Sequence, residues 1–119
     1  MTVSLIISPD KTQKLLEINN KSIRDILDID TCLGPFSSSD KSFSLIVYYN
    51  SCQKNKNLND CENRNIIGEN ILNYINRKIG IFDKQYIYDD IGIIKYVYGK
   101  QSDIQIGDFE LVFNNENLL

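Results

Sequence analysis

The feature that most constrains the fold of this chain is the kind of apolar residue it uses. Ile dominates the apolar positions, Tyr occurs seven times, and Ala does not occur in the 119 residues. β-Branched and aromatic side chains suit the pleated surface of a sheet better than the crowded surface of a helix. The strongest run, Phe43–Tyr49, therefore predicts a strand in a central position.

Length and composition predict one compact domain over residues 1–119. The chain is 42% hydrophobic and 24% charged, both ordinary for a globular protein. At this length, folding removes about two-thirds of the unfolded chain's surface from water, so no metal or disulfide is needed for stability.

Five further segments carry strand signals. Thr2–Ser8 and Lys14–Ile18 flank the turn residues Pro9-Asp10-Lys11 and predict a hairpin. Tyr86–Tyr88 and Gly92–Tyr98 are expected to pair around a turn at Asp89-Asp90. In addition, Ile104–Phe113 is expected to be the last strand, bent at Gly107.

Two segments carry helix signals. Ser22–Asp28 begins with a serine cap, and Leu33-Gly34-Pro35 is expected to stop this helix or the turn after it. Ile66–Lys78 has helical apolar spacing and a stop at Gly80, although Gly68 would allow a later start, at Glu69. The elements together predict an α+β fold: a five- or six-stranded mixed or antiparallel sheet with two helices packed on one face.

Charge and chemistry exclude several functional classes. The net charge is −3, which argues against a protein that binds the phosphate backbone of nucleic acids. No apolar stretch approaches the ~20 residues of a membrane span, and the first residues lack a signal-peptide pattern, so we expect a cytoplasmic protein and no membrane partner. Cys32, Cys52 and Cys61 are too few for a structural zinc site without histidine, and we expect three free thiols.

The absence of histidine also restricts catalysis. There is no imidazole base or ligand, and no Walker-type or dinucleotide-binding glycine motif, so we expect no metal and no cofactor. Asp89-Asp90 is interpreted as a polar turn. The long polar loop Asn50–Asn65 is either functional or mobile.

Four tyrosines are the candidate binding residues. Tyr86 and Tyr88 share one face of their segment, and Tyr96 and Tyr98 share one face of the next, so pairing would gather all four rings. Such rings complete a core, contact a protein partner or stack on single-stranded bases. Nearby acidic residues leave no net basic patch, which favours protein over nucleic acid.

The order of the signals resembles a family of small uncharacterised domains from bacteriophages and giant DNA viruses. The resemblance rests on the Ser-capped helix after Ile18, the Phe43–Tyr49 strand, Asn63-Arg64-Asn65 leading into a helix, and Ile106-Gly107-Asp108 before a final apolar strand. The composition is similar to that of amoeba-infecting giant viruses. The resemblance implies a fold and a viral setting in the host cytoplasm, without a mechanism.

The sequence therefore predicts a non-catalytic, viral module that binds a protein partner or itself through a tyrosine-rich sheet face. The alternative is a small histidine-independent enzyme or nucleotide-binding protein that uses Asp, Glu, Lys or Cys side chains. Carboxylates converging in an apolar cleft with Arg64 or a lysine would favour the enzyme.

Overall fold

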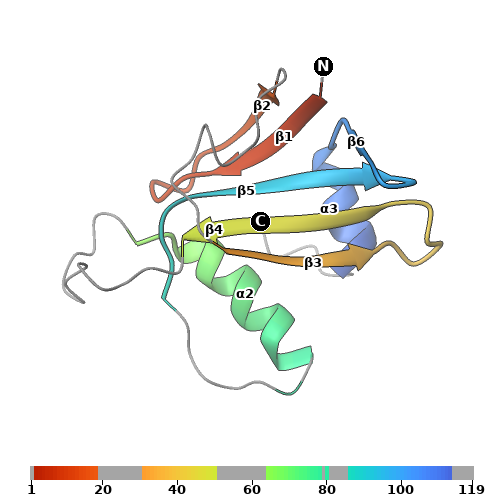
Figure 1. Ribbon diagram of the computed structural model, residues 1–119. Helices are drawn as coiled ribbons and strands as arrows, with labels where there is room; N and C mark the ends of the chain where they lie inside the picture. Colours follow the sequence, from red (N-terminus) through yellow and green to blue (C-terminus); the bar gives the residue numbers. More distant parts are fainter. Residues whose placement is uncertain (1, 19–30, 51–63, 79, 81–85, 114–119) are drawn as a thin grey trace.

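A computed structural model of the chain describes residues 2–18, 31–50, 64–78, 80 and 86–113. These residues form the predicted α+β fold, with a six-stranded antiparallel sheet and two helices (Figure 1). The strands are β1 (Thr2–Ile7), β2 (Gln13–Ile18), β3 (Thr31–Ser37), β4 (Ser44–Asn50), β5 (Tyr88–Val97) and β6 (Lys100–Ser102), and the helices are α2 (Ile66–Lys78) and α3 (Ile106–Phe113).

The sheet is organised around β5. The strand order is β2-β1-β5-β4-β3, and every pairing is antiparallel. β1 pairs with Ile91 to Ile93 of β5, while β6 pairs with Lys95 to Val97 along the same side. The predicted hairpin is confirmed as β1 and β2, and the predicted Phe43–Tyr49 strand is confirmed as β4, inside the sheet between β5 and β3.

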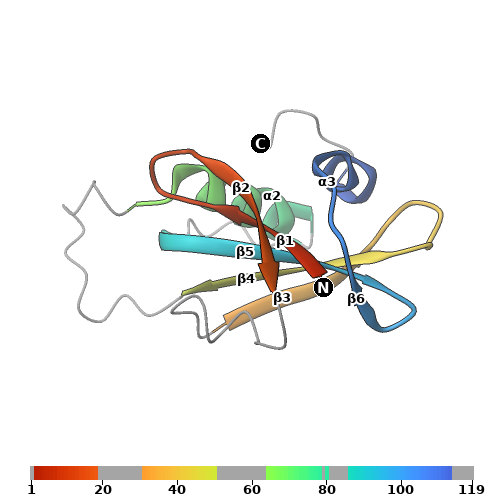
Figure 2. The same cartoon turned by 90° about the horizontal axis from the view of Figure 1, so that it is seen from above.

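Both helices pack on one face of the sheet, as Figure 2 shows. Helix α2 turns Ile71, Leu72 and Ile75 toward the sheet, and α3 contributes Phe109 and Phe113 to the same core. Full burial of each such side chain stabilises the fold by roughly 1.5–3 kcal/mol. This hydrophobic layer holds α2 and α3 on one side of β5. Neither described helix is long and apolar enough to cross a membrane.

The opposite face of the sheet, here called the second face, has a smaller apolar cluster. Its fully buried members are Ile6 and Ile94, with Leu16, Tyr48 and Tyr96 packed against them. The burial of β4 alternates strictly along the strand, with Leu45, Val47 and Tyr49 in the core under the helices and the intervening residues on the second face. Tyr96 therefore belongs to the face opposite the helices.

The prediction that Leu33-Gly34-Pro35 ends a helix or the turn after it is wrong, because these residues lie inside β3. β3 is an edge strand, and its pairing with β4 shifts register between Leu33 and Phe36. Proline lacks the N–H that a ladder needs and is tolerated at such an edge irregularity. The helix predicted at Ser22–Asp28 lies outside the described residues.

The predicted strand pair around Asp89-Asp90 is also wrong, because β5 runs from Tyr88 to Val97 without a turn. Asp89 has a φ of 64°, and the partner strand shifts register between Tyr48 and Asn50. The two aspartates form a β-bulge, which has the same polar composition as a turn but keeps the strand running.

The predicted last strand is a helix, α3, preceded by Ile104, whose backbone N–H donates to the carbonyl oxygen of Val3. The carboxylate of Asp108 accepts a 2.8 Å hydrogen bond from the backbone N–H of Gln105, which caps the helix. Phe109 and Phe113 share the core-facing side at helical spacing. A short apolar run fits both periods, and here the cap and the core contact favour the helix.

Candidate functional site

The four candidate tyrosines lie at two opposite ends of β5. Tyr88 begins the strand, and Tyr96 lies eight residues further along it, a separation of ~26 Å at the usual strand rise. Tyr86 precedes the strand and Tyr98 follows it. The structure therefore does not bring the four rings into one patch.

At the first end, the tyrosines belong to the fold. Tyr88 is only 1% exposed, and its backbone forms a β-bridge with Arg64. Tyr86 is half-buried, and the Arg64 guanidinium carbon lies 5.0 Å from the centre of its ring. A cation in this position is attracted by the ring electrons, so the contact fixes Tyr86 against the start of α2.

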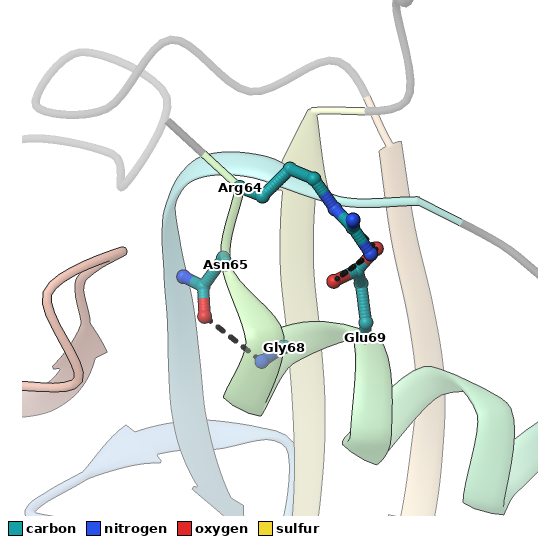
Figure 3. A network of polar contacts seen from close by, with 4 residues as sticks. All are labelled: Arg64, Asn65, Gly68 and Glu69. Atoms are coloured by element: carbon teal, nitrogen blue, oxygen red, sulfur yellow. Dashed lines mark hydrogen bonds and ion pairs between the residues drawn. The ribbon is translucent and has the colours of Figure 1, made fainter. Parts of the chain in front are cut away.

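Asn65 is the centre of this end of the sheet (Figure 3). Its side chain is fully buried, and its Oδ1 accepts a 2.9 Å hydrogen bond from the backbone N–H of Gly68, which caps α2. Its Nδ2 donates to the carbonyl oxygens of Ile7 at 2.8 Å and Asp89 at 3.0 Å. One amide thus ties together β1, the β5 bulge and the helix.

Arg64 and Glu69 flank this joint (Figure 3). Nη2 of Arg64 lies 2.8 Å from Oε1 and 3.2 Å from Oε2 of Glu69, whose side chain is 5% exposed. Gly68 lies beside them, and a larger residue would be crowded there. A Cβ at this position would come within 3.2 Å of the Asn65 amide and 3.3 Å of Ile91. The polar side chains of this cluster are engaged in contacts within the fold, so the cluster is a structural joint.

At the other end, Tyr96 and Tyr98 line an open hollow on the second face. The hollow has a volume of about 430 Å³, and its lining includes Pro35, Lys41, Ser42, Ile46, Tyr96 and Tyr98. Its lining residues come from the β3–β4 turn, the β5–β6 turn and the adjoining strands. Figure 1 shows both turns at the same end of the sheet. Among the described residues that line the hollow, Pro35, Ile46 and the tyrosine rings are apolar, while Ser42 and Lys41 bring a hydroxyl and an ammonium group.

Tyr96 is anchored within this hollow. It pairs in register with Ser44 of β4, and its hydroxyl lies 3.2 Å from the hydroxyl of Tyr48. The ring is half-buried and belongs to the apolar cluster of the second face. Tyr96 therefore forms a fixed wall of the hollow.

Tyr98, in contrast to Tyr96, is exposed to solvent. Its side chain is 95% exposed, and its φ is 50°. Tyr98 and Gly99, with a φ of 78°, form the two-residue turn between β5 and β6, where both positions have left-handed backbone as in type I′ turns. Such turns favour Asn and Gly, and a bulky residue there is uncommon.

Lys41 is a second left-handed residue that lines the hollow, with a φ of 59°. Its turn is built on Asp40, whose Oδ1 accepts hydrogen bonds from the Ser42 hydroxyl, the Ser42 backbone N–H and the Ser38 hydroxyl, at 2.7, 3.0 and 2.8 Å. These bonds, led by that of the Ser42 hydroxyl, lower the pKa of Asp40 to about 2.

The same turn occurs once more, at the other end of the sheet. Ser8-Pro9-Asp10-Lys11-Thr12 matches Ser38-Ser39-Asp40-Lys41-Ser42 in its Ser, Asp, Lys and hydroxyl positions. The Asp10 carboxylate accepts hydrogen bonds from Thr12, and Lys11 has a φ of 71°. The repeated pattern predicts left-handed backbone at Lys41, a residue that is not among the candidates predicted from the sequence.

Acidic side chains of the described residues do not converge in a cleft. The two buried carboxylates lie apart, Glu69 with Arg64 and Asp108 with Lys95, whose Nζ is 3.0 Å from Asp108 Oδ2. Within residues 2–18, 31–50, 64–78, 80 and 86–113, no three Cys, Asp or Glu side chains gather as a metal site would require. Cys32 is an exposed free thiol on β3, while Cys52 and Cys61 lie outside the described residues.

The chain was compared with protein-family models, curated proteins and solved structures. No protein-family model, no curated protein and no solved structure matches the chain. The resemblance to bacteriophage and giant-virus domains therefore stays a prediction.

Proposed function

We propose that the chain is a non-catalytic protein-binding module whose contact surface is the hollow between Lys41 and Tyr98. Tyr96 forms the wall of this surface and Tyr98 its projecting ring. The surface is smaller than the four-tyrosine face expected from the sequence, since Tyr88 is buried and Tyr86 contacts Arg64.

The observation that carries the proposal is the conformation of Tyr98. A non-glycine residue in an uncommon backbone region costs of order 1–3 kcal/mol, and such costs concentrate at functional sites. Exposure of 95% means that the ring gains almost nothing within its own chain. A partner that buries the ring would supply the missing stabilisation, and tyrosine is among the residues that contribute most at protein interfaces.

The alternative, an enzyme, lacks a comparable observation. In the part of the chain that the structure describes, each buried carboxylate is paired with a cation, Glu69 with Arg64 and Asp108 with Lys95. Asp40 lies next to the lining residue Lys41, and its hydrogen bonds with Ser38 and Ser42 hold it charged. A general acid or base near neutral pH would need a pKa shifted in the other direction.

Site-specific photocrosslinking tests the proposal. Tyr98 is replaced by benzoylphenylalanine in the full chain, expressed in cells, and the control carries the same group at Leu15, which is 51% exposed on β2. A discrete adduct from position 98 that is absent from position 15 supports the proposal, whether the captured protein is another protein or this chain. Equal or absent labelling at the two positions would overturn it.

A further inference from the structure

The second face carries both a projecting ring and a hollow, in contact with each other. Tyr98 projects from the β5–β6 turn, which curls to the side away from the helices in Figure 2, and it is also part of the hollow's rim. A surface with a projection beside a recess can meet its own copy around a two-fold axis, because each projection then enters the other's recess. Building on the proposed function, we infer that the partner at this surface is a second copy of the chain.

The hollow suits a tyrosine ring. Its apolar wall includes Pro35, Ile46 and the ring of Tyr96, and its volume of about 430 Å³ exceeds that of one aromatic side chain. Ser42 and Ser44 also line it, and their hydroxyl oxygens can accept a hydrogen bond from the phenol of an entering tyrosine. The recess therefore offers both the apolar side chains and the hydroxyl groups that a buried tyrosine needs.

The charges at the rim favour a copy of the same chain over a strongly charged partner. Lys41 lines the hollow, and its neighbour Asp40 carries the opposite charge with a pKa of about 2. Across a two-fold axis, each Lys41 ammonium can lie over the partner's Tyr98 ring and near the partner's Asp40. A nucleic acid or an acidic peptide would find one cation already next to an anion.

Backbone pairing is not needed for this contact. Beneath the hollow, β4 and β5 are paired within the sheet, through Ser44 with Tyr96 and Ile46 with Ile94. The contact is therefore made by side chains. Two tyrosine rings bury roughly 150–250 Å² each, a fraction of the ~1,600 Å² of a standard interface, so the expected dimer is reversible and concentration-dependent.

Sedimentation velocity of the purified full chain, from micromolar to millimolar concentration, tests the inference. The unmodified chain is expected to show a monomer–dimer equilibrium. Tyr98→Asn is expected to raise the dimer Kd at least ~30-fold, because a buried interface tyrosine is lost twice per dimer. Tyr98→Phe keeps the ring and the backbone, and it is expected to change the Kd by less than this.

The repeated turn supplies a matched control. Lys41→Asn is expected to raise the Kd at least ~5-fold through two lost cation–ring contacts. Lys11→Asn makes the same change in the same kind of turn at the other end of the sheet, and it is expected to leave the Kd unchanged. Equal effects of the two lysine variants would overturn the inference, because they would indicate a general effect of charge.

Two further outcomes would overturn the inference and would separate it from the proposed function. The first is a chain that stays monomeric throughout the concentration range while the crosslinker at position 98 captures a different protein, which retains the binding surface. The second is a dimer whose Kd is unaffected by Tyr98→Asn, which would place self-association elsewhere. In the dimer proposed here, the position 98 crosslinker labels peptides of the same chain that contain Ile46 or Ser42, at twice the chain mass.

Discussion

The two ends of β5 carry similar residues, but these residues differ in their contacts with the rest of the fold. Each end has a left-handed residue, Asp89 with a φ of 64° and Tyr98 with a φ of 50°. At the first end, a β-bulge accommodates Asp89, whose carbonyl oxygen accepts a hydrogen bond from Asn65. At the second end, the side chain of Tyr98 lies in solvent.

This difference separates a structural cost from a functional one. The backbone cost at Asp89 is offset within the chain, because the bulge lets one buried amide cap α2 and join it to β1. The comparable backbone cost at Tyr98 is not offset by packing of its ring, because the ring is exposed. Under the proposed function, a partner that buries the ring offsets this cost. Mutations at the two ends should therefore have opposite effects on the stability of the unbound chain.

The largest expected effect is at Asn65. Asn65→Ala removes the cap of α2 and leaves the carbonyl oxygens of Ile7 and Asp89 without their donor, so we expect about 3 kcal/mol of lost stability. Chemical denaturation with a two-state fit measures this loss.

Asn65→Asp sharpens the comparison, because aspartate is as good a helix cap as asparagine on an exposed helix. Here the second carboxylate oxygen would face the carbonyl oxygens of Ile7 and Asp89, so we expect a loss at least as large as that of Asn65→Ala. An aspartate variant as stable as the unmodified chain would show that the two donated hydrogen bonds contribute little.

The next effect has the opposite sign. Tyr98→Asn places a residue that tolerates left-handed backbone at the first position of the β5–β6 turn, and the exposed ring has little packing to lose. We expect a gain of about 1 kcal/mol, measured by denaturation at low protein concentration so that association does not contribute. A destabilised variant would show that the ring supports the fold, and the end of β5 that carries Tyr98 would then resemble the Asn65 end.

The sequence predicted those parts of the fold whose signals are local. The bounds of α2 follow from its apolar spacing and from Gly80, whose N–H donates to the carbonyl oxygen of Arg77. The first hairpin follows from its turn residues. The predictions for Asp89-Asp90 and for Ile104–Phe113 are wrong, because a polar pair inside a strand resembles a turn and a short apolar run fits two periods.

The candidate site was predicted only in part, because its members meet through long-range pairing. Tyr96 and Tyr98 were named, but Lys41 reaches them only because Ser44 pairs with Tyr96 across β4 and β5. The separation of Tyr86 and Tyr88 from the hollow depends on β5 continuing through Asp89. Neither the register between β4 and β5 nor the continuation of β5 can be predicted from residue spacing.

The smallest expected effect compares the two repeated turns, which lie at opposite ends of the sheet. Asp40 accepts hydrogen bonds from Ser42 and Ser38, and these lower its pKa from 3.8 to about 2. Asp10 accepts hydrogen bonds from Thr12, which also lower its pKa. Because the folded pKa of Asp40 lies below the unfolded value, its stabilising effect is complete above pH ~4 and is lost as the pH falls toward 2.

Side-chain carboxyl chemical shifts, followed by NMR through acid titration, measure both aspartates in one sample. Ser42→Ala should raise the pKa of Asp40 most, because the Ser42 hydroxyl makes the largest contribution, and Ser38→Ala should raise it less. Neither change should affect Asp10, at the far end of the sheet. If Asp40 titrates near 3.8 in the unmodified chain, the serine network that shapes the Lys41 turn does not form in solution, and the rim of the hollow is less ordered than the Asn65 joint.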